Sequence, residues 1–249
     1  MQATEPLNGS NPRFWGRYFN GTDNRKYQYN RDPVQYNGNT VSENEFLSAV
    51  NIPVLCWARQ MWAVSDAYAS VAADHAKKNM QGVIAAFGAQ YLFNSRIVPT
   101  LYLDLEPESG YPEHVMAQAY YTNWSAAIVA GLTAGGYAIK FRPAGYLNLG
   151  DNGQSFLNLN AACAAGSVCD GVWPARYVKA DENSAPPQAS DMQWSNDPPA
   201  HDSFPPGQPD QHIPKIGWQY FGNYQGDVDF DMVNPAYETL VMKGVVPSP

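Results

Sequence analysis

The sequence predicts a single α/β domain with the architecture of a (β/α) TIM-like barrel, irregular in its first third. Strand-like apolar runs alternate with helix-like runs along most of the 249 residues, an order typical of a mainly parallel sheet. Seven strands are expected, and residues 20–42 leave room for an eighth. No Gly-x-Gly-x-x-Gly follows the first strand, so an open dinucleotide-binding sheet is not favoured.

The expected strands share short apolar or aromatic runs that end at turn residues. They span residues 14–19, 52–58, 97–106, 137–141, 172–177, 216–221 and 228–231. Ser42 and Glu45 form a capping box, which predicts a short helix through Val50. Longer helices are expected over residues 65–87, 112–132, 154–165 and 235–242. Gly135 and Gly136 are expected to cap the second long helix at its carboxyl end.

Two polar segments interrupt this order. Residues 1–13 predict a flexible N-terminal arm, which leaves residues 14–249 as the barrel domain. Within that domain, residues 178–214 hold much of the proline and show little apolar periodicity. A loop of that length inside a compact domain is usually functional, so we expect it to cover the site or set substrate length.

Two acids stand at the end of a buried strand, in Leu103-Asp104-Leu105-Glu106. Residues two apart in a strand point to the same face, so Asp104 and Glu106 should lie side by side with the leucines behind them. Adjacent carboxyl groups disfavour each other's ionisation, and one of them then keeps a proton near neutral pH. This pattern predicts acid-assisted cleavage of a sugar linkage.

Other candidate residues also fall at expected strand ends. In a (β/α) barrel, side chains at the carboxyl ends of the strands meet in one site. Aromatic faces stack on sugar rings, and charged or hydroxyl groups bind sugar hydroxyls. The expected substrate-binding residues are Asp229, Trp218, Trp173, Arg176, Tyr177 and Arg17.

The order of these motifs resembles the lysozyme-like barrels of glycoside hydrolase family 25, and still more their relatives in the glycoside-hydrolase-like DUF1906 group. The matching motifs are Leu103-Asp104-Leu105-Glu106, Gly135-Gly136-Tyr137, Val172-Trp173-Pro174-Ala175-Arg176-Tyr177, and Trp218-Gln219-Tyr220 followed by Val228-Asp229-Phe230-Asp231. The resemblance covers roughly residues 14–242. It implies a metal-free barrel that cleaves β-1,4 bonds of peptidoglycan.

The resemblance also implies a role for each acid. Glu106 would be the general acid, and Asp104 would stabilise the oxocarbenium-like centre or orient the substrate's N-acetyl group. Asp229 would match the acid near the end of the barrel. One position departs from the lysozymes, which carry an aspartate on the first strand where this chain has Arg17.

Arg17 leaves a second function open. A cation that pairs with Asp104 or Glu106 lowers the pKa of that acid and opposes proton donation. The alternative is therefore a catalytically silent barrel that binds cell-wall glycan. A chitinase-like hydrolase is a third option, although the acidic strand lacks the additional aspartates typical of those enzymes.

Composition limits the partners. The net charge is −8 and no Lys/Arg cluster is present, which argues against nucleic acid. No apolar run approaches the ~20 residues of a membrane span. The cysteines and histidines show no ligand spacing, so neither metal nor cofactor is expected. We expect a monomer whose partner is a polysaccharide or cell-wall glycan.

The N-terminal residues have neither the basic start nor the apolar core of a secretion signal. The protein is then either secreted or periplasmic with its leader removed, or cytoplasmic. A disulfide between Cys163 and Cys169 would close a small loop and imply an oxidising compartment, and the sequence leaves both states of this pair open.

Overall fold

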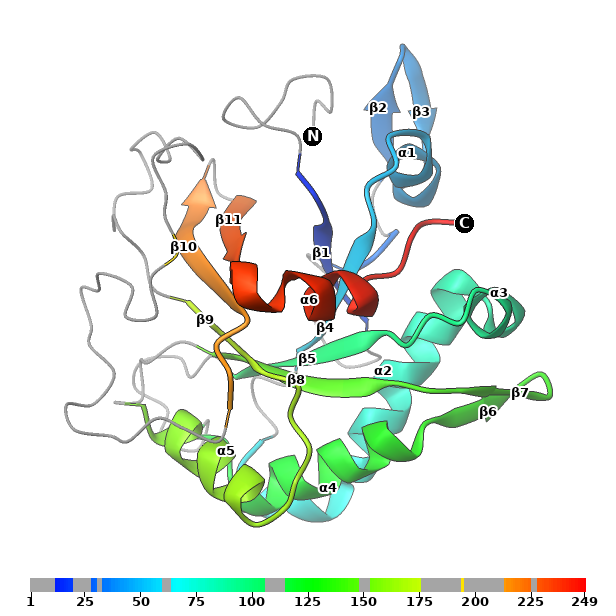
Figure 1. Cartoon of the computed structure of the whole chain (residues 1–249). Helices are drawn as coiled ribbons and strands as arrows, with labels where there is room; N and C mark the ends of the chain where they lie inside the picture. Colours follow the sequence, from blue (N-terminus) through cyan, green and yellow to red (C-terminus); the bar gives the residue numbers. More distant parts are fainter. Residues whose placement is uncertain are drawn as a thin grey trace.

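A curved parallel sheet forms the centre of the fold (Figure 1). The computed structural model describes residues 12–19, 28–30, 33–59, 64–105, 115–147, 153–175, 194, 213–224 and 228–249. Five strands pair in the order β1-β4-β5-β8-β9, and every pair is parallel. Their bounds are β1 Trp15–Tyr18, β4 Val54–Arg59, β5 Thr100–Leu105, β8 Arg142–Leu147 and β9 Val172–Pro174.

Two further strands extend this sheet beyond β9. Parallel bridges join Val172 to Lys215 and Ala175 to Gln219, which places β10 (Gly217–Tyr224) beside β9. β11 (Val228–Val233) then returns antiparallel to β10. The prediction of an α/β fold with a parallel sheet is therefore confirmed.

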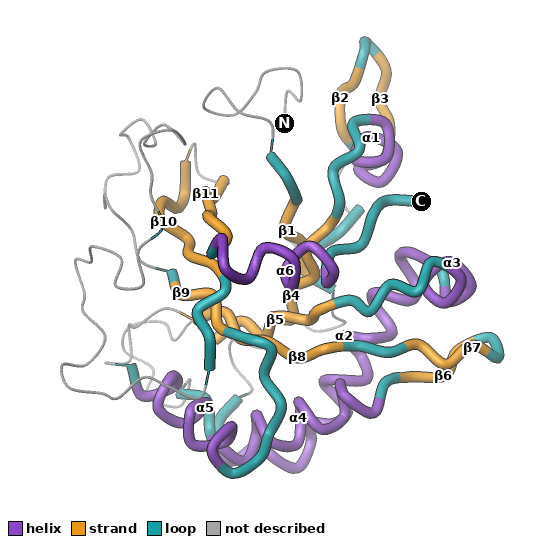
Figure 2. Tube along the Cα trace, viewed as in Figure 1, coloured by secondary structure: helices purple, strands orange, loops and turns teal. Residues whose placement is uncertain are grey.

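Helices cover the outer face of the sheet (Figure 2). They are α2 (Ala72–Phe87), α4 (Gln118–Ala130) and α5 (Gln154–Ala164), and a 3₁₀ helix, Asp66–Val71, precedes α2. Strand alternation points Leu101, Leu103 and Leu105 toward the helices, where they are buried in one core cluster. Burial of this apolar layer holds the helices against the sheet.

The amino ends of the strands are closed by the last helix. A 3₁₀ turn, Pro235–Tyr237, leads into α6 (Glu238–Gly244). Val246 then pairs with Val54, the first residue of β4, through backbone hydrogen bonds of 2.7 and 2.8 Å. Arg142, the first residue of β8, donates to the carbonyl of Leu240 at 3.2 Å. Functional side chains at the opposite, carboxyl ends therefore lie away from α6.

Aromatic side chains on the inner face show how strongly the sheet curves. Adjacent strands lie about 4.8 Å apart, so β4 and β9 would be about 14 Å apart in a flat sheet. Yet the rings of Trp57 and Trp173 have centroids only 6.0 Å apart, and Phe14, just before β1, packs edge-on against Trp173 at 5.7 Å. The inner face is therefore concave, and its two edges approach each other through Trp173.

The β6–β7 hairpin and strand β8 differ from what the sequence predicted. Gly135 and Gly136 form the turn of a hairpin, β6 (Leu132–Ala134) with β7 (Tyr137–Ile139), whereas α4 ends earlier, at Gly131. The strand expected over residues 137–141 is thus the return of a hairpin, and the sheet strand β8 comes after it. Proline and two small residues inside β8 concealed it, because they lower strand propensity.

Outside these elements the expectations mostly hold. The capping box is confirmed: Ser42 and Glu45 exchange both hydrogen bonds at the start of α1 (Glu43–Ala49). The described part of residues 20–42 holds a separate hairpin, β2 (Val34–Tyr36) with β3 (Asn39–Val41), and a single parallel bridge from Gln28 to Tyr18 at the end of β1. A short helix, α3 (Ala89–Asn94), was not expected. Most of the N-terminal arm and of loop 178–214 lies outside the described residues.

Gly217 tests the packing around Trp173. A Cβ at this position would lie 2.1 Å from the Trp173 ring, which is itself fully buried. Gly217→Ala should lower the free energy of unfolding by roughly 1–3 kcal/mol through overpacking. Urea denaturation measures the change, with Val129→Ala on the exposed side of α4 as the control, expected within about 0.5 kcal/mol of the parent. Equal losses in the two variants would contradict this packing.

Candidate active site

Asp104 lies buried at the carboxyl end of β5. Its residue exposure is 0 %, and it shares the concave face with Tyr102, two residues earlier. The hydroxyl of Tyr18, the last residue of β1, donates to Asp104 Oδ2 at 2.8 Å. β4 lies between β1 and β5, so the two side chains reach each other across an intervening strand on the concave face.

The predicted orientation of the acidic strand is confirmed for the described residues. Leu103 and Leu105 pack toward the helices, whereas Asp104 faces the other way. Glu106 follows directly after the last residue of β5 and lies outside the described residues. The predicted contact between the two carboxyl groups therefore stays a prediction.

Two more polar pairs lie on the same concave face. The Tyr146 hydroxyl, from β8, donates to Gln219 Oε1 in β10. The Trp173 indole, from β9, donates to Asp231 Oδ1 at 2.7 Å. Gln219 and Asp231 are direct partners across the β10–β11 pair, so their side chains share one face.

The surroundings of Asp231 raise the pKa of its carboxyl group. Burial, reinforced by the negative charge of Asp229, raises the pKa of Asp231 to about 8, against a smaller lowering effect of the Trp173 hydrogen bond. Asp229 itself is exposed. At neutral pH Asp231 therefore carries a proton, whereas the sequence had favoured Asp229 as the functional acid of this segment.

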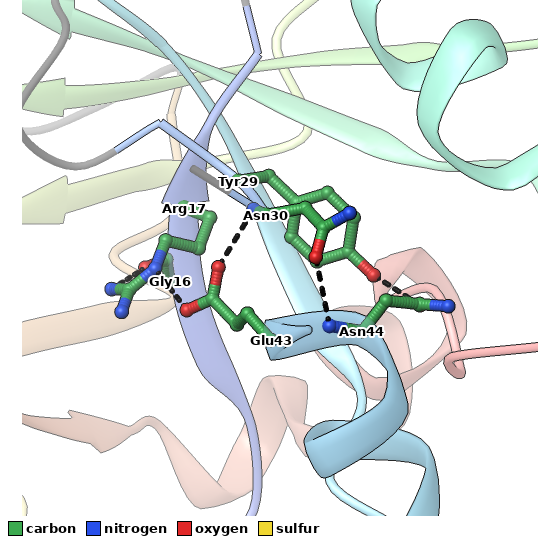
Figure 3. A network of polar contacts seen from close by, with 6 residues as sticks. All are labelled: Gly16, Arg17, Tyr29, Asn30, Glu43 and Asn44. Carbon is green, nitrogen blue, oxygen red and sulfur yellow. Dashed lines mark hydrogen bonds and ion pairs between the residues drawn. The ribbon is translucent and has the colours of Figure 1, made fainter. Parts of the chain in front are cut away.

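Arg17 faces away from Asp104. It alternates with Tyr18 along β1, and its Nε donates to Glu43 Oε1 at 2.6 Å (Figure 3). Its guanidinium also lies 4.8 Å from the centroid of the Trp15 ring. Glu43, which is 6 % exposed, also accepts from the backbone N–H of Asn30 at 2.8 Å. The hypothesis that Arg17 pairs with Asp104 is therefore wrong, because strand alternation sends the two side chains of β1 to opposite faces.

The two tryptophans expected at the site are buried. Trp173 is 0 % exposed and packs between aromatic rings of the concave face, and Trp218 is 1 % exposed and packs with Tyr220 on the other side of β10. Neither ring is exposed, so the expectation that Trp173 and Trp218 stack on a sugar is corrected. Large aromatic side chains are usually buried, and these two fill the interior of the protein. Arg176 and Tyr177 lie outside the described residues.

Several residues of this constellation were not predicted from the sequence. Tyr18, Tyr146 and Gln219 occupy ordinary strand positions, and nothing local distinguishes them. The alternation of Asp227, Asp229 and Asp231 was visible, but only the register of β10 with β11 selects Asp231. Tertiary pairing, which no short motif encodes, brings these groups together.

A separate groove lies on the helical side of the sheet. It has a volume of about 470 Å³ and is lined by Asp66, residues at the start of α4, and Asn158 of α5. Its lining is mostly small and amide side chains, and it shares no residue with the concave face. We place the candidate site at the carboxyl ends of the strands because the buried Asp104 and the partly buried Asp231 both face the concave side there.

Within the described ranges, no cluster of three or more His, Cys, Asp or Glu residues is arranged to bind a metal ion. Among the helices described, none is both long and apolar enough to cross a membrane. No protein-family model, curated protein or solved structure matches this chain. The resemblance to glycoside hydrolases therefore rests on the motifs alone.

Removing the charge of Glu43 should destabilise the fold. Glu43→Gln leaves the largely buried Arg17 guanidinium without a counter-charge, and we expect a loss of roughly 3 kcal/mol in the free energy of unfolding. The matched control is Glu238→Gln, which removes an exposed ion pair with Arg13, whose side chains are 44 % and 61 % exposed. That variant should lose less than about 1 kcal/mol in the same urea titration. Similar losses would contradict a structural role for Glu43.

Asp231 predicts a pH dependence of stability. Between the ordinary carboxyl pKa of 3.8 and about 8, the folded protein holds a proton on Asp231 that the unfolded chain has lost. The free energy of unfolding therefore falls as pH rises through this window, by the contribution of this one group. In Asp231→Asn that contribution is absent, so the variant should gain stability relative to the parent as pH rises.

Denaturant unfolding of the parent and the variant across this window measures the difference. Asp229→Asn is the partner control: it removes the neighbouring charge, lowers the pKa of Asp231, and should narrow the window without abolishing it. A difference between parent and Asp231→Asn that stays constant with pH would contradict the protonation of Asp231.

Proposed function

We propose that this protein is a glycoside hydrolase that cleaves β-1,4 bonds in a peptidoglycan-like polysaccharide of N-acetylated sugars. The observation that carries the proposal is the buried Asp104 carboxyl group at the carboxyl end of β5, two residues before Glu106. Enzymes with parallel strands and surrounding helices place their catalytic groups at this end of the sheet. The motif order shared with family 25 and the DUF1906 group names the substrate class.

The proposal also includes a closed (β/α) barrel as the architecture. The described strands curve enough for side chains near β1 and β9 to touch, as they would in a closed (β/α) barrel. Such a barrel needs about eight strands. Closure between β11 and β1 is part of the proposal, together with loop 178–214 as a cover over the site.

Glu106 and Asp104 have different roles in this mechanism. Glu106 donates a proton to the oxygen of the leaving sugar, and positive charge then develops at the anomeric carbon. Asp104 is the supporting carboxyl group in this mechanism. Tyr18 fixes its Oδ2, so its carboxyl group orients the substrate's acetamido group or stabilises the developing charge.

Asp231 supports acid-assisted chemistry in the same hollow. It keeps its proton at neutral pH, because burial raises its pKa to about 8. A carboxyl group that keeps its proton at neutral pH is the kind of group that acid-assisted chemistry requires. Trp173 donates a hydrogen bond to Asp231, and Tyr146 donates one to Gln219, the cross-strand partner of Asp231. These bonds hold the group in a fixed arrangement.

A second candidate is a barrel that binds cell-wall glycan without cutting it. The full burial of Asp104 beneath Tyr18 favours it, since a carboxyl group already bound inside the protein contacts substrate only after rearrangement. Neutralisation of Asp104 by Arg17 no longer favours it, because Arg17 pairs with Glu43. A contact of Arg17 with Glu106 stays a prediction. In both cases the protein acts as a secreted or periplasmic monomer on a glycan.

Substitution of the two acids tests the hydrolase. Glu106→Gln should lower the rate of sugar release from peptidoglycan by about 10²–10⁴-fold, because an amide donates no proton, while the melting temperature stays near that of the parent. Asp104→Asn keeps an acceptor for Tyr18 and should also lower the rate. Glu108→Gln, in the same acidic stretch beyond Pro107, serves as the matched control and should keep its activity.

Release of reducing sugar is measured beside equilibrium binding to peptidoglycan fragments. Parent-level sugar release by Glu106→Gln would overturn the assignment of the acid. Binding by the parent without any released sugar would replace the hydrolase with the second candidate.

A further inference from the structure

The turn between α5 and β9 brings two cysteines together. The N–H of Ser167 donates to the carbonyl of Ala162 at 3.0 Å, and the N–H of Gly166 donates to that of Cys163 at 2.9 Å. Gly166 has a φ of +101°, in the left-handed region that a helix end of this kind requires. The chain reverses here, and Cys169 returns to the side of Cys163.

The two thiols are in direct contact. All three cysteines are free, and the side chains of Cys163 and Cys169 interact directly across the turn. The contact lowers the pKa of the Cys163 thiol, whereas burial, together with the same contact, raises the pKa of Cys169 well above its usual value. Cys163 is therefore the more readily ionised partner, whereas the Cys169 thiol donates to the carbonyl of Gly171 at 3.3 Å.

The surrounding contacts hold this turn in place while leaving it accessible. The Tyr121 hydroxyl of α4 donates to the carbonyl of Val168 at 3.1 Å, and Ser167 donates to Thr122 Oγ1 at 3.1 Å. Both cysteines are partly exposed, whereas Cys56 is 0 % exposed in the core of β4. A small reagent therefore reaches the pair but not the third thiol.

We propose that Cys163 and Cys169 are a reactive dithiol that closes into an intramolecular disulfide by exchange with a low-molecular-weight disulfide such as oxidised glutathione. A disulfide requires two cysteines whose side chains already approach each other, since separated ones need backbone movement. Here the helix end and the contacts to α4 supply that approach. The proposal is independent of the glycoside hydrolase function.

The exchange balances without another reagent. The Cys163 thiolate attacks one sulfur of oxidised glutathione, breaks the S–S bond and expels one glutathione thiolate. Cys169 loses its proton and attacks the sulfur of Cys163, which expels the second glutathione. The protein loses two electrons and two protons, and glutathione disulfide is reduced to two thiols.

The test uses the full chain, reduced, freed of reductant and incubated with oxidised glutathione in the absence of air. We expect two of the three thiols to disappear, the mass to fall by two hydrogen atoms, and one cross-linked peptide to join Cys163 to Cys169. The melting temperature of the oxidised form should rise by roughly 5 °C, because the cross-link restricts the unfolded chain.

Single substitutions separate the roles of the thiols. Cys169→Ser should accumulate a stable glutathione adduct on Cys163, because nothing displaces it. Cys163→Ser should react much more slowly at Cys169, and Cys56→Ala should behave as the parent does. Thiols that stay reduced, or that each carry a separate adduct, would overturn the proposal, as would oxidation of Cys56 at the same rate.

Discussion

The packing of Trp173 across the concave face is the constraint on which the rest of this structure depends. Its ring contacts aromatic side chains from β4, from β5 and from the segment before β1, which only a strongly curved sheet allows. Gly217 lies directly beside the ring, in a space that no side chain can share with it. The curvature follows from filling the interior with large rings, because an interior void forfeits dispersion contacts and leaves apolar surface unpaired.

Curvature then determines the electrostatics of the candidate site. Polar groups from five strands, which would be spread along a flat sheet, face one hollow: Tyr18, Asp104, Tyr146, Gln219 and Asp231. The same aromatic packing that gathers them also removes water from around them, so each depends on a protein partner. Asp104 has Tyr18, and Asp231 has Trp173 together with a retained proton. The arrangement of the candidate site therefore follows from the packing of the aromatic core.

The two faces of β1 carry side chains with different roles, one structural and one at the candidate site. On β1, the side chain that leaves the hollow, Arg17, anchors α1 through Glu43, and the one that enters it, Tyr18, reaches Asp104. Arg17 therefore stands next to Tyr18 in the sequence but does not neutralise Asp104.

The sequence by itself determined the alternation of strands and helices, the capping box before α1, and the orientation of the acidic strand with Leu103 and Leu105 behind Asp104. Each of these depends on periodicity or on hydrogen bonds between near neighbours. Tertiary structure alone decided that Tyr18 and not Arg17 meets Asp104, that Trp173 and Trp218 are interior, that Gly135–Gly136 turns a hairpin, and that Asp231 holds the proton. Those outcomes depend on which distant strands become neighbours and how far the sheet bends, because burial and pairing are properties of the folded whole.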